Sequence, residues 1–263
     1  MLSLPYLMRP SLHLPTMTED LSNIHLSKAE FQEYGYRLVD WLAEYFDNVD
    51  QYQVLPSIEP GDIRNMLPVS APERAESMDE IIDDLDRVVM PGVAHWQHPG
   101  WYAFFPSGAS PVSALGEFVA AGLATQGMMW STAPAATEIE NTVLDWLVDL
   151  LGLPSSWRLD EGPGGGVIQM SASDSTHLSL AVARHQFELS GADANSLVAY
   201  GSSQAHSSIE KGARIAGFKH IRSVPVTQTF GIDTDAFVRI VRDDIDSGLI
   251  PAWVCSAVGT TNT

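Results

Sequence analysis

Hydroxyl side chains gather around Asp174 in the stretch GGGVIQMSASDSTHL, which begins at Gly164. They belong to Ser171, Ser173, Ser175 and Thr176. A helix that starts near Asp174 would place Ala172 and Ser173 at its N-terminus, where free N–H groups and the helix dipole attract anions. Ordinary N-capping is the alternative interpretation, but a cap needs only one such side chain. The cluster therefore favours an anion-binding turn.

Two further polar groups follow predicted strands. His206 comes after the strand SLVAYGS and before a helix that Ser207 and Glu210 would cap, and Thr260 follows the last strand, AWVCSAV. The strands of a parallel sheet end at a common edge, so both groups would lie at the same edge as Ser173. A lone histidine is more often structural, but its position at a strand edge beside a candidate anion site favours a functional role for His206. For the hydroxyl of Thr260, a β-turn is an equally good interpretation.

The elements that must position these groups alternate between strand and helix. Strands are predicted near residues 166–170, 196–202, 221–226 and 252–258, and helices near 174–190, 207–217 and 234–247. Regular alternation of this kind is typical of a largely parallel sheet covered by helices. The sequence therefore predicts an α/β fold for its second half.

The first half is predicted to be helical. A helix with a capping box at Ser27 and Glu30 carries a wide apolar face as far as Val49, which would pack on the later domain or on a second subunit. Shorter helices are predicted near residues 77–90 and 112–124. Another helix would begin with a capping box at Thr137 and Glu140 and end before Gly152.

Composition limits the class of protein. The chain has 263 residues, 45% of them hydrophobic, and a formal net charge of -19. An acidic surface repels nucleic acid and anionic membranes, so we expect neither as a partner. The apolar start is broken by prolines and Arg9, so we expect no signal peptide, a cytoplasmic location and a possible true start at Met17.

The sequence gives little support for a metal site or a reactive thiol. His95 and His98 lie in an aromatic tract without acidic or cysteine partners at ligand spacing, so we interpret them as packing or pocket-lining residues and expect no metal. Cys255 is the single cysteine and is predicted to be an inert core thiol within a buried strand.

Several motifs occur in an order that is similar to one enzyme family. They are MPGVAHWQHPGWYAFFPSGAS, MMWSTAPAATEIE, GGGVIQMSASDST, QAHSSIEKGARIAG and GTTNT. From about Ser27 to Thr263 the chain resembles the amino-terminal half of the pyridoxal-phosphate-dependent group II decarboxylases, in the aromatic-L-amino-acid branch. The resemblance implies the aspartate-aminotransferase-like α/β fold (fold type I). The domains would be a tail (1–26), an N-terminal helical dimerisation segment (27–95) and an incomplete, truncated large domain (96–263).

The same resemblance implies roles for particular residues. Ala172, Ser173 and Thr260 would bind the cofactor, pyridoxal 5'-phosphate. His206 would stack on its ring and act as the catalytic residue. The substrate pocket would be lined by Phe104, Phe105, Pro106, Ser107 and Trp130. The resemblance also implies a homodimer that acts on a small amino acid, most simply an aromatic one.

One departure from the family pattern affects activity. The only lysines are Lys28, Lys211 and Lys219, and none follows a histidine as the cofactor-binding lysine of the family does. We therefore expect the chain alone to be an inactive fragment of a decarboxylase and to aggregate readily. The alternatives are a non-enzymatic binding or dimerisation module and one half of a split enzyme.

Overall fold

The computed structural model describes residues 25–72, 75–105, 108–162 and 164–258. These residues fall into two compact units that divide between Trp101 and Tyr102. The tail predicted for residues 1–26 lies almost entirely outside the described residues, and the predicted domain limits stay a prediction. Within the described ranges, no helix combines the length and the apolar character that crossing a bilayer requires.

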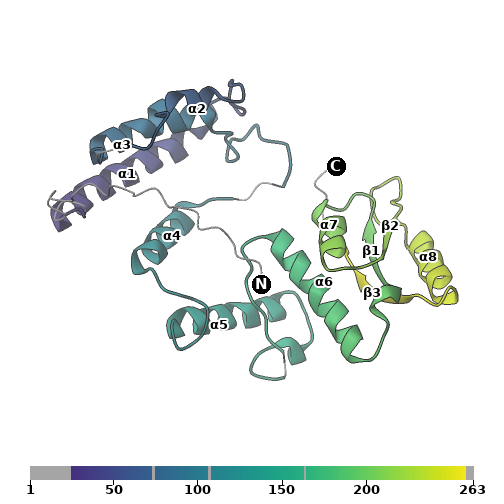
Figure 1. Ribbon diagram of the computed structural model, residues 1–263. Coiled ribbons are helices and arrows are strands. Elements are labelled where there is room, and N and C mark those ends of the chain that lie inside the picture. Colours follow the sequence, from purple (N-terminus) through teal and green to yellow (C-terminus); the bar gives the residue numbers. More distant parts are fainter. Residues whose placement is uncertain (1–24, 73–74, 106–107, 163, 259–263) are drawn as a thin grey trace, which may run out of the picture. The chain divides into compact units, whose positions relative to one another are not determined.

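The first unit is helical (Figure 1). It contains α1 (Lys28–Asn48), α2 (Asp62–Met66) and α3 (Met78–Asp84), and α3 continues through a π-helical turn and a 3-10 turn to Gly92. The predicted capping box of α1 is confirmed, because Ser27 Oγ accepts from the Glu30 N–H at 3.3 Å and the Glu30 carboxylate accepts from the Ser27 N–H at 2.7 Å. Ser77 and Glu80 begin α3 in the same way.

Part of the apolar face of α1 is used inside its own unit. Trp41 Nε1 donates to Asp86 Oδ1 at 3.0 Å, and the Tyr45 ring lies 5.7 Å from the His95 ring. We had expected this face to pack on the later domain or on a second subunit, yet these contacts are made to residues that follow α3. Phe31 remains 53% exposed, so the face is only partly covered.

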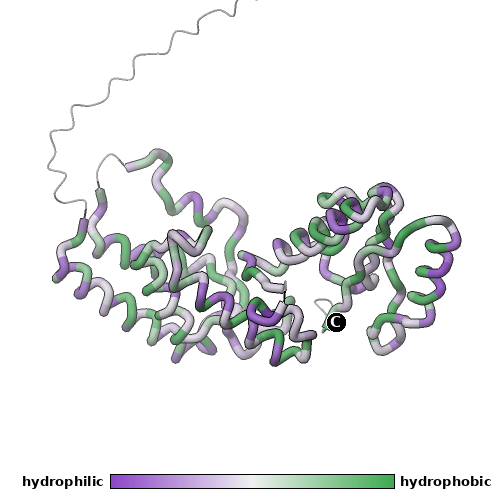
Figure 2. Tube along the Cα trace, turned by 90° about the horizontal axis from the view of Figure 1, so that it is seen from below, coloured by the Kyte–Doolittle hydropathy of each residue, from purple (hydrophilic) through white to green (hydrophobic). Residues whose placement is uncertain are grey.

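The second unit begins with α4 (Pro111–Leu123), α5 (Pro134–Leu150) and α6 (Ala172–Leu189). Strand and helix then alternate through β1 (Leu197–Ser202), α7 (Ser208–Ile215), β2 (His220–Val224), α8 (Thr234–Asp246) and β3 (Ile250–Val254). Hydrophobic and hydrophilic stretches alternate along the helices in Figure 2, as amphipathic packing requires. From β1 to β3 the predicted order of strands and helices is therefore confirmed.

The three described strands form a parallel sheet in the order β2-β1-β3. Val198 pairs with His220 of β2, and Leu197 pairs with Ile250 of β3. The central strand is covered on both faces. Leu197 and Ala199 pack against α6 and α7 around Leu180 and Ala213, and the opposite face, with Val198 and Tyr200, packs against apolar residues of α8. This arrangement explains why β1 is a continuous run of buried residues.

A buried polar network ties α8 to the sheet. Asp244 is 5% exposed and accepts hydrogen bonds from Tyr200 Oη at 3.0 Å and from the Arg222 guanidinium. Burial acts to raise the pKa of Asp244, but the hydrogen bonds from Arg222 and Tyr200 outweigh it and lower that pKa. The network therefore holds a charged carboxylate inside the α/β layer.

The strand predicted near residues 166–170 is wrong. These residues form no regular element; Val167 and Ile168 are 54% and 58% exposed. The Ile168 N–H is held by the carboxylate of Glu140 at 2.7 Å and not by a neighbouring strand. A strand exists only where a second strand satisfies its main chain, and the described sheet offers this segment none.

Two other sequence-based predictions are corrected. The capping box at Thr137 and Glu140 is wrong, because α5 already begins at Pro134 and Thr137 Oγ1 donates to the Ala133 carbonyl from inside the helix. Cys255 lies just beyond the end of β3 and is only partly buried, so it is not a core thiol within the strand. Burial still raises the pKa of the Cys255 thiol, which makes it less reactive.

Candidate functional site

The N-terminus of α6 presents unpaired donors. Ser171 is the N-cap, and its Oγ accepts from the Asp174 N–H at 3.1 Å. Among the described residues, neither the N–H groups of Ala172 and Ser173 nor the Ser173 hydroxyl has a protein partner. The first turn of a helix leaves such N–H groups free, and the helix dipole adds to their attraction for an anion.

The other hydroxyls of this cluster are bonded within the first turns of α6. Ser171 Oγ donates to Asp174 Oδ2 at 2.8 Å. Ser175 Oγ donates to the Ser171 carbonyl at 3.4 Å, and Thr176 Oγ1 donates to the Ala172 carbonyl at 2.9 Å. The sequence suggested four hydroxyls around one site. The structure leaves Ser173 as the hydroxyl of that group that is free to bind a ligand, together with two main-chain donors.

His206 lies between the end of β1 and the start of α7. Its Nδ1 accepts from the Ser208 N–H at 3.2 Å and lies 3.0 Å from Ser208 Oγ. The capping box predicted at Ser207 and Glu210 is wrong, because the Ser207 side chain makes no capping bond and the imidazole caps the helix instead. Since Nδ1 accepts, the neutral ring carries its proton on Nε2.

The turns that carry Ser173 and His206 lie at the same end of two parallel helices. A Cβ atom on Gly212 of α7 would come within 2.6 Å of the His177 ring of α6, and further along Arg184 Nη1 of α6 donates to the Ala216 carbonyl at 2.8 Å. Positions 177 and 184 of α6 therefore match positions 212 and 216 of α7. Ser173 lies one helical turn before His177, on the same face of α6. Ser173 is therefore on the side of α6 that faces the start of α7.

A polar hollow of about 260 Å³ adjoins His206 where β1 and β2 end. Its lining includes Ser202, Ser203, Ser207, Ser223, Glu210 and Arg214. The hollow supplies hydroxyl, carboxylate and guanidinium groups at the edge where the sequence predicted chemistry. It therefore extends the set of polar groups around His206.

The predicted substrate residues are only partly described. Phe104 and Phe105 are 66% and 73% exposed, and Phe104 has a positive φ of 59° that is uncommon for a bulky residue. Trp130 is 58% exposed, and its Nε1 donates to Glu138 Oε1 at 2.8 Å. Pro106, Ser107 and Thr260 lie outside the described residues. Their roles as substrate and cofactor residues stay predictions.

His95 and His98 both make hydrogen bonds within the first unit. His95 is 4% exposed, its Nδ1 lies 3.1 Å from Tyr45 Oη, and the Tyr52 ring stacks on it at 4.7 Å. Burial lowers the pKa of His95. His98 Nδ1 accepts from the Gly100 N–H at 2.7 Å. In the part of the chain that the structure describes, no three His, Cys, Asp or Glu side chains converge on a position for a metal ion.

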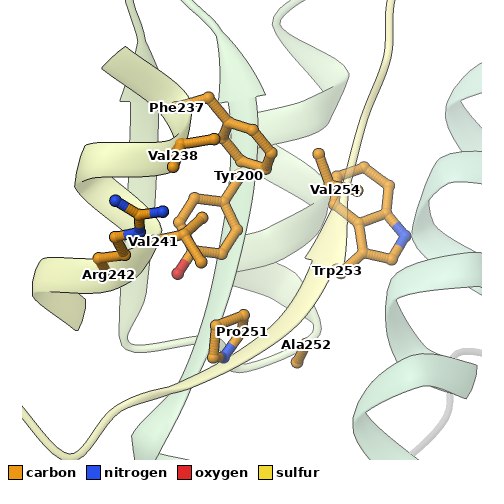
Figure 3. A pocket seen from close by; sticks show the side chains of 9 residues that line it. All are labelled: Tyr200, Phe237, Val238, Val241, Arg242, Pro251, Ala252, Trp253 and Val254. Carbon is orange, nitrogen blue, oxygen red and sulfur yellow. The ribbon is translucent and has the colours of Figure 1, made fainter. Parts of the chain in front are cut away.

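A larger hollow, of about 410 Å³, lies between β3 and α8 (Figure 3). Its walls are mainly apolar, with Phe237 and Val241 on one side and Pro251 and Val254 on the other. Tyr200 and Arg242 are the polar residues of its lining, and the Tyr200 hydroxyl is already bonded to Asp244, so the size of the groove does not make it the reactive site. It follows the outer edge of β3, which is an edge strand of the described sheet.

Comparisons with known proteins identify the family of this chain. Residues 60–263 match the family model described as the pyridoxal-dependent decarboxylase conserved domain. The chain belongs to this family. Its expected α/β fold with a parallel sheet, preceded by an N-terminal helix, is confirmed by solved decarboxylase structures that it matches over about half their length.

Three relatives place this chain in the aromatic amino-acid branch of the family. It is 38% identical to L-tyrosine/L-DOPA decarboxylase 2 of Lophophora williamsii over 96% of its own length and 49% of the relative. It is 38% identical to phenylacetaldehyde synthase of Arabidopsis thaliana, over 90% of this chain and 50% of that relative. A structure of Catharanthus roseus tryptophan decarboxylase with L-tryptophan matches with a TM-score of 0.83 at 39% identity, over 90% of this chain and 52% of that one. The chain thus spans about half the length of these relatives.

The donor set at the N-terminus of α6 fits the phosphate of the family's cofactor. Two unpaired N–H groups and one free hydroxyl can surround a phosphate, and the small side chain of Ala172 leaves it room to approach. The planar, solvent-facing imidazole of His206 suits stacking on a pyridine ring. The described residues are therefore compatible with pyridoxal phosphate.

Two side chains that support this site were not predicted from the sequence. Ser208 is 8% exposed and holds the His206 ring, and the dipeptide that follows His206 was the signal for it. Glu140 was interpreted as part of a helix cap, whereas its carboxylate holds the main chain that leads to α6. No sequence pattern predicts that contact, because 28 residues separate the two groups.

Proposed function

We propose that this chain supplies the cofactor-binding part of a pyridoxal-phosphate-dependent decarboxylase of aromatic L-amino acids. The observation that carries the proposal is the unpaired N-terminus of α6 at Ala172 and Ser173, at the same end of the helix pair as the turn of His206. The names of the relatives, which refer to tyrosine, DOPA and tryptophan, support an aromatic substrate.

Each residue has a defined task in this proposal. The Ala172 and Ser173 N–H groups and the Ser173 hydroxyl hold the phosphate, and Thr260 makes a further contact with the cofactor. His206 stacks on the ring, held in orientation by Ser208 at its Nδ1. When bound, pyridoxal phosphate supplies an electron-withdrawing ring that accepts the electron pair released as carbon dioxide leaves.

The aromatic residues would recognise the substrate. Phe104, Phe105 and Trp130 present large exposed rings that can pack on an aromatic amino acid and exclude water from it. Their exposure in this chain suits a pocket that a second subunit completes, so we propose a homodimer. Pro106 and Ser107, which lie outside the described residues, keep their predicted role in substrate binding.

Lysine content limits what residues 1–263 do alone. Lys28 is the first residue of α1, Lys211 lies within α7, and Lys219 precedes β2, and none of them follows a histidine as the cofactor-binding lysine of the family does. We propose that cofactor binding resides in this chain and that decarboxylation needs a lysine from elsewhere. The alternative, a non-enzymatic dimerisation module, is favoured by the partly uncovered face of α1, where Phe31 stays exposed.

The proposal is tested by titrating the chain with pyridoxal phosphate and following the cofactor's absorbance and fluorescence. Ser173→Asp places a carboxylate against the phosphate and should weaken binding at least about tenfold. Ser179→Asp, on the same helix at an exposed position, is the matched control and should bind as the wild type does.

The same samples separate the alternatives. Binding that is equal in both variants, or absent in the wild type, contradicts the proposed cofactor site and favours the dimerisation module. Release of carbon dioxide from L-tryptophan, L-tyrosine or L-DOPA by residues 1–263 alone would contradict the need for a further lysine.

A further inference from the structure

The main chain between residues 165 and 168 lies along α5. The Ile168 N–H donates to Glu140 Oε1 at 2.7 Å, and a Cβ atom on Gly166 would come within 3.3 Å of Leu144 Cδ2. Glu140 and Leu144 are one helical turn apart, so they present one side of α5 to this segment. The segment therefore runs antiparallel to the helix and rests on it.

The bond from Glu140 is the strongest contact of this segment with α5. A carboxylate that accepts from a main-chain N–H forms a charge-assisted hydrogen bond, which is shorter and stronger than a neutral one. Glu140 is half-buried, and its partner Ile168 is 58% exposed. Because residues 164–169 form no strand in this structure, the segment lacks the ladder of bonds that would otherwise hold it.

Ile168 lies three residues before the N-cap of α6, Ser171. A shift of the main chain at Ile168 would pass directly to the N–H groups of Ala172 and Ser173. Hydrogen bonds to a phosphate depend on donor direction as well as on distance, so a small rotation of this turn would weaken them. The position of the donors is thus linked to a carboxylate on another helix.

We propose that Glu140 is a positioning residue for the phosphate-binding turn at Ala172 and Ser173. Its carboxylate holds residues 165–168 on α5 and so sets the direction of the two N–H donors. The inference rests on the proposed function for its ligand, while its structural part concerns only residues of this chain.

α5 offers a matched control. Asp145 Oδ1 accepts from the Leu159 N–H at 3.0 Å, which is the same type of carboxylate–amide bond from the same helix. Its partner lies in the loop before Gly164, farther along the chain from Ser173. Loss of Asp145 should loosen that loop and leave the phosphate-binding turn in place.

The experiment compares Glu140→Ala, Glu140→Gln and Asp145→Ala in the full chain by two measurements. Hydrogen exchange with mass spectrometry reports the protection of residues 164–173 without cofactor, and fluorescence titration gives the dissociation constant for pyridoxal phosphate. Glu140→Ala should speed exchange in residues 164–173 and raise the dissociation constant about tenfold, which corresponds to about 1.4 kcal/mol. Glu140→Gln keeps an acceptor oxygen, so its dissociation constant should fall between those of the wild type and the alanine variant.

Asp145→Ala should speed exchange near residue 159 without changing the dissociation constant. The inference is overturned if Glu140→Ala binds the cofactor as tightly as the wild type, or if Asp145→Ala weakens binding equally. If the wild type binds no pyridoxal phosphate, the proposed function fails. In that case the hydrogen-exchange measurement alone tests the positioning role of Glu140. Unchanged protection of residues 164–173 in Glu140→Ala overturns that role as well.

Discussion

Replacing Asp244 by alanine should destabilise the α/β unit strongly. Asp244 joins α8 to two strands through Tyr200 and Arg222, and it is 5% exposed. Asp244→Ala leaves the Tyr200 hydroxyl, on a residue that is 2% exposed, without a partner. It also leaves the Arg222 guanidinium without its counter-charge.

The magnitude follows from these two losses. An unsatisfied buried hydroxyl costs about 1–3 kcal/mol. Breaking a fully buried ion pair costs about 3–5 kcal/mol, but the Arg222 side chain is 33% exposed and water can solvate part of it. We therefore expect the free energy of unfolding to fall by about 3 kcal/mol, a large share of the stability of a domain. Tyr200→Phe keeps the ion pair and should cost only about 1 kcal/mol.

The assay is urea unfolding followed by circular dichroism, with exchange of the β1 amides as a local probe. With a denaturant slope of about 2 kcal/mol per molar, Asp244→Ala should lower the midpoint by about 1–2 M. A midpoint within about 0.3 M of the wild type would refute the role given to this network. A larger loss in Tyr200→Phe than in Asp244→Ala would refute it equally.

Acidity provides a second test of the same network. The pKa of Asp244 is lowered in the folded chain from its ordinary value of 3.8. The contribution of Asp244 to the free energy of unfolding is therefore present above pH 3.8. It is lost as the pH falls from 3.8 toward the lower pKa of the folded state. Between neutral pH and about pH 3, the stability difference between the wild type and Asp244→Ala should shrink.

Three further predictions concern other contacts. Gly212→Ala should lower the free energy of unfolding by about 1–3 kcal/mol, because the new Cβ would lie 2.6 Å from the His177 ring. Urea unfolding of the double variant Gly212→Ala/His177→Ala should show that part of this loss is recovered. Ser171→Ala removes the N-cap of α6 and should cost about 1 kcal/mol, with faster exchange at the start of that helix. Burial lowers the pKa of His95, so the first unit should lose thermal stability as the pH falls below the ordinary value of 6.5. His95→Gln should flatten this pH dependence. Equal slopes of melting temperature against pH in the wild type and the variant would contradict the prediction.

The sequence predicted the elements whose pattern is local. The capping box at Ser27, the helix that became α4 and the alternation from β1 to β3 depend on short-range periodicity, and the structure confirms them. The strand near residues 166–170 failed because a strand needs a neighbour that the local sequence does not show. The start of α5 was misplaced for a different reason, since Pro134 at the first helical turn begins the helix before Thr137 can cap it.

The candidate site was predictable only in outline. The type of turn at Ser173 and the position of His206 after a strand follow from the sequence, and the structure places both at one end of the α6–α7 pair. The free donors could not be identified, because only the geometry shows that Ser175 and Thr176 bond to helix carbonyls. Contacts such as that of Glu140 with Ile168 depend on tertiary packing and leave no periodic signal.

The central claim is that the N-terminus of α6 binds the phosphate of pyridoxal phosphate. The most direct measurement compares the dissociation constants of the chain for pyridoxal phosphate and for pyridoxal, which lacks the phosphate. Pyridoxal should bind at least about a hundredfold more weakly, since the donors at Ala172 and Ser173 would have no anion to hold. Equal dissociation constants for the two compounds would contradict the claim.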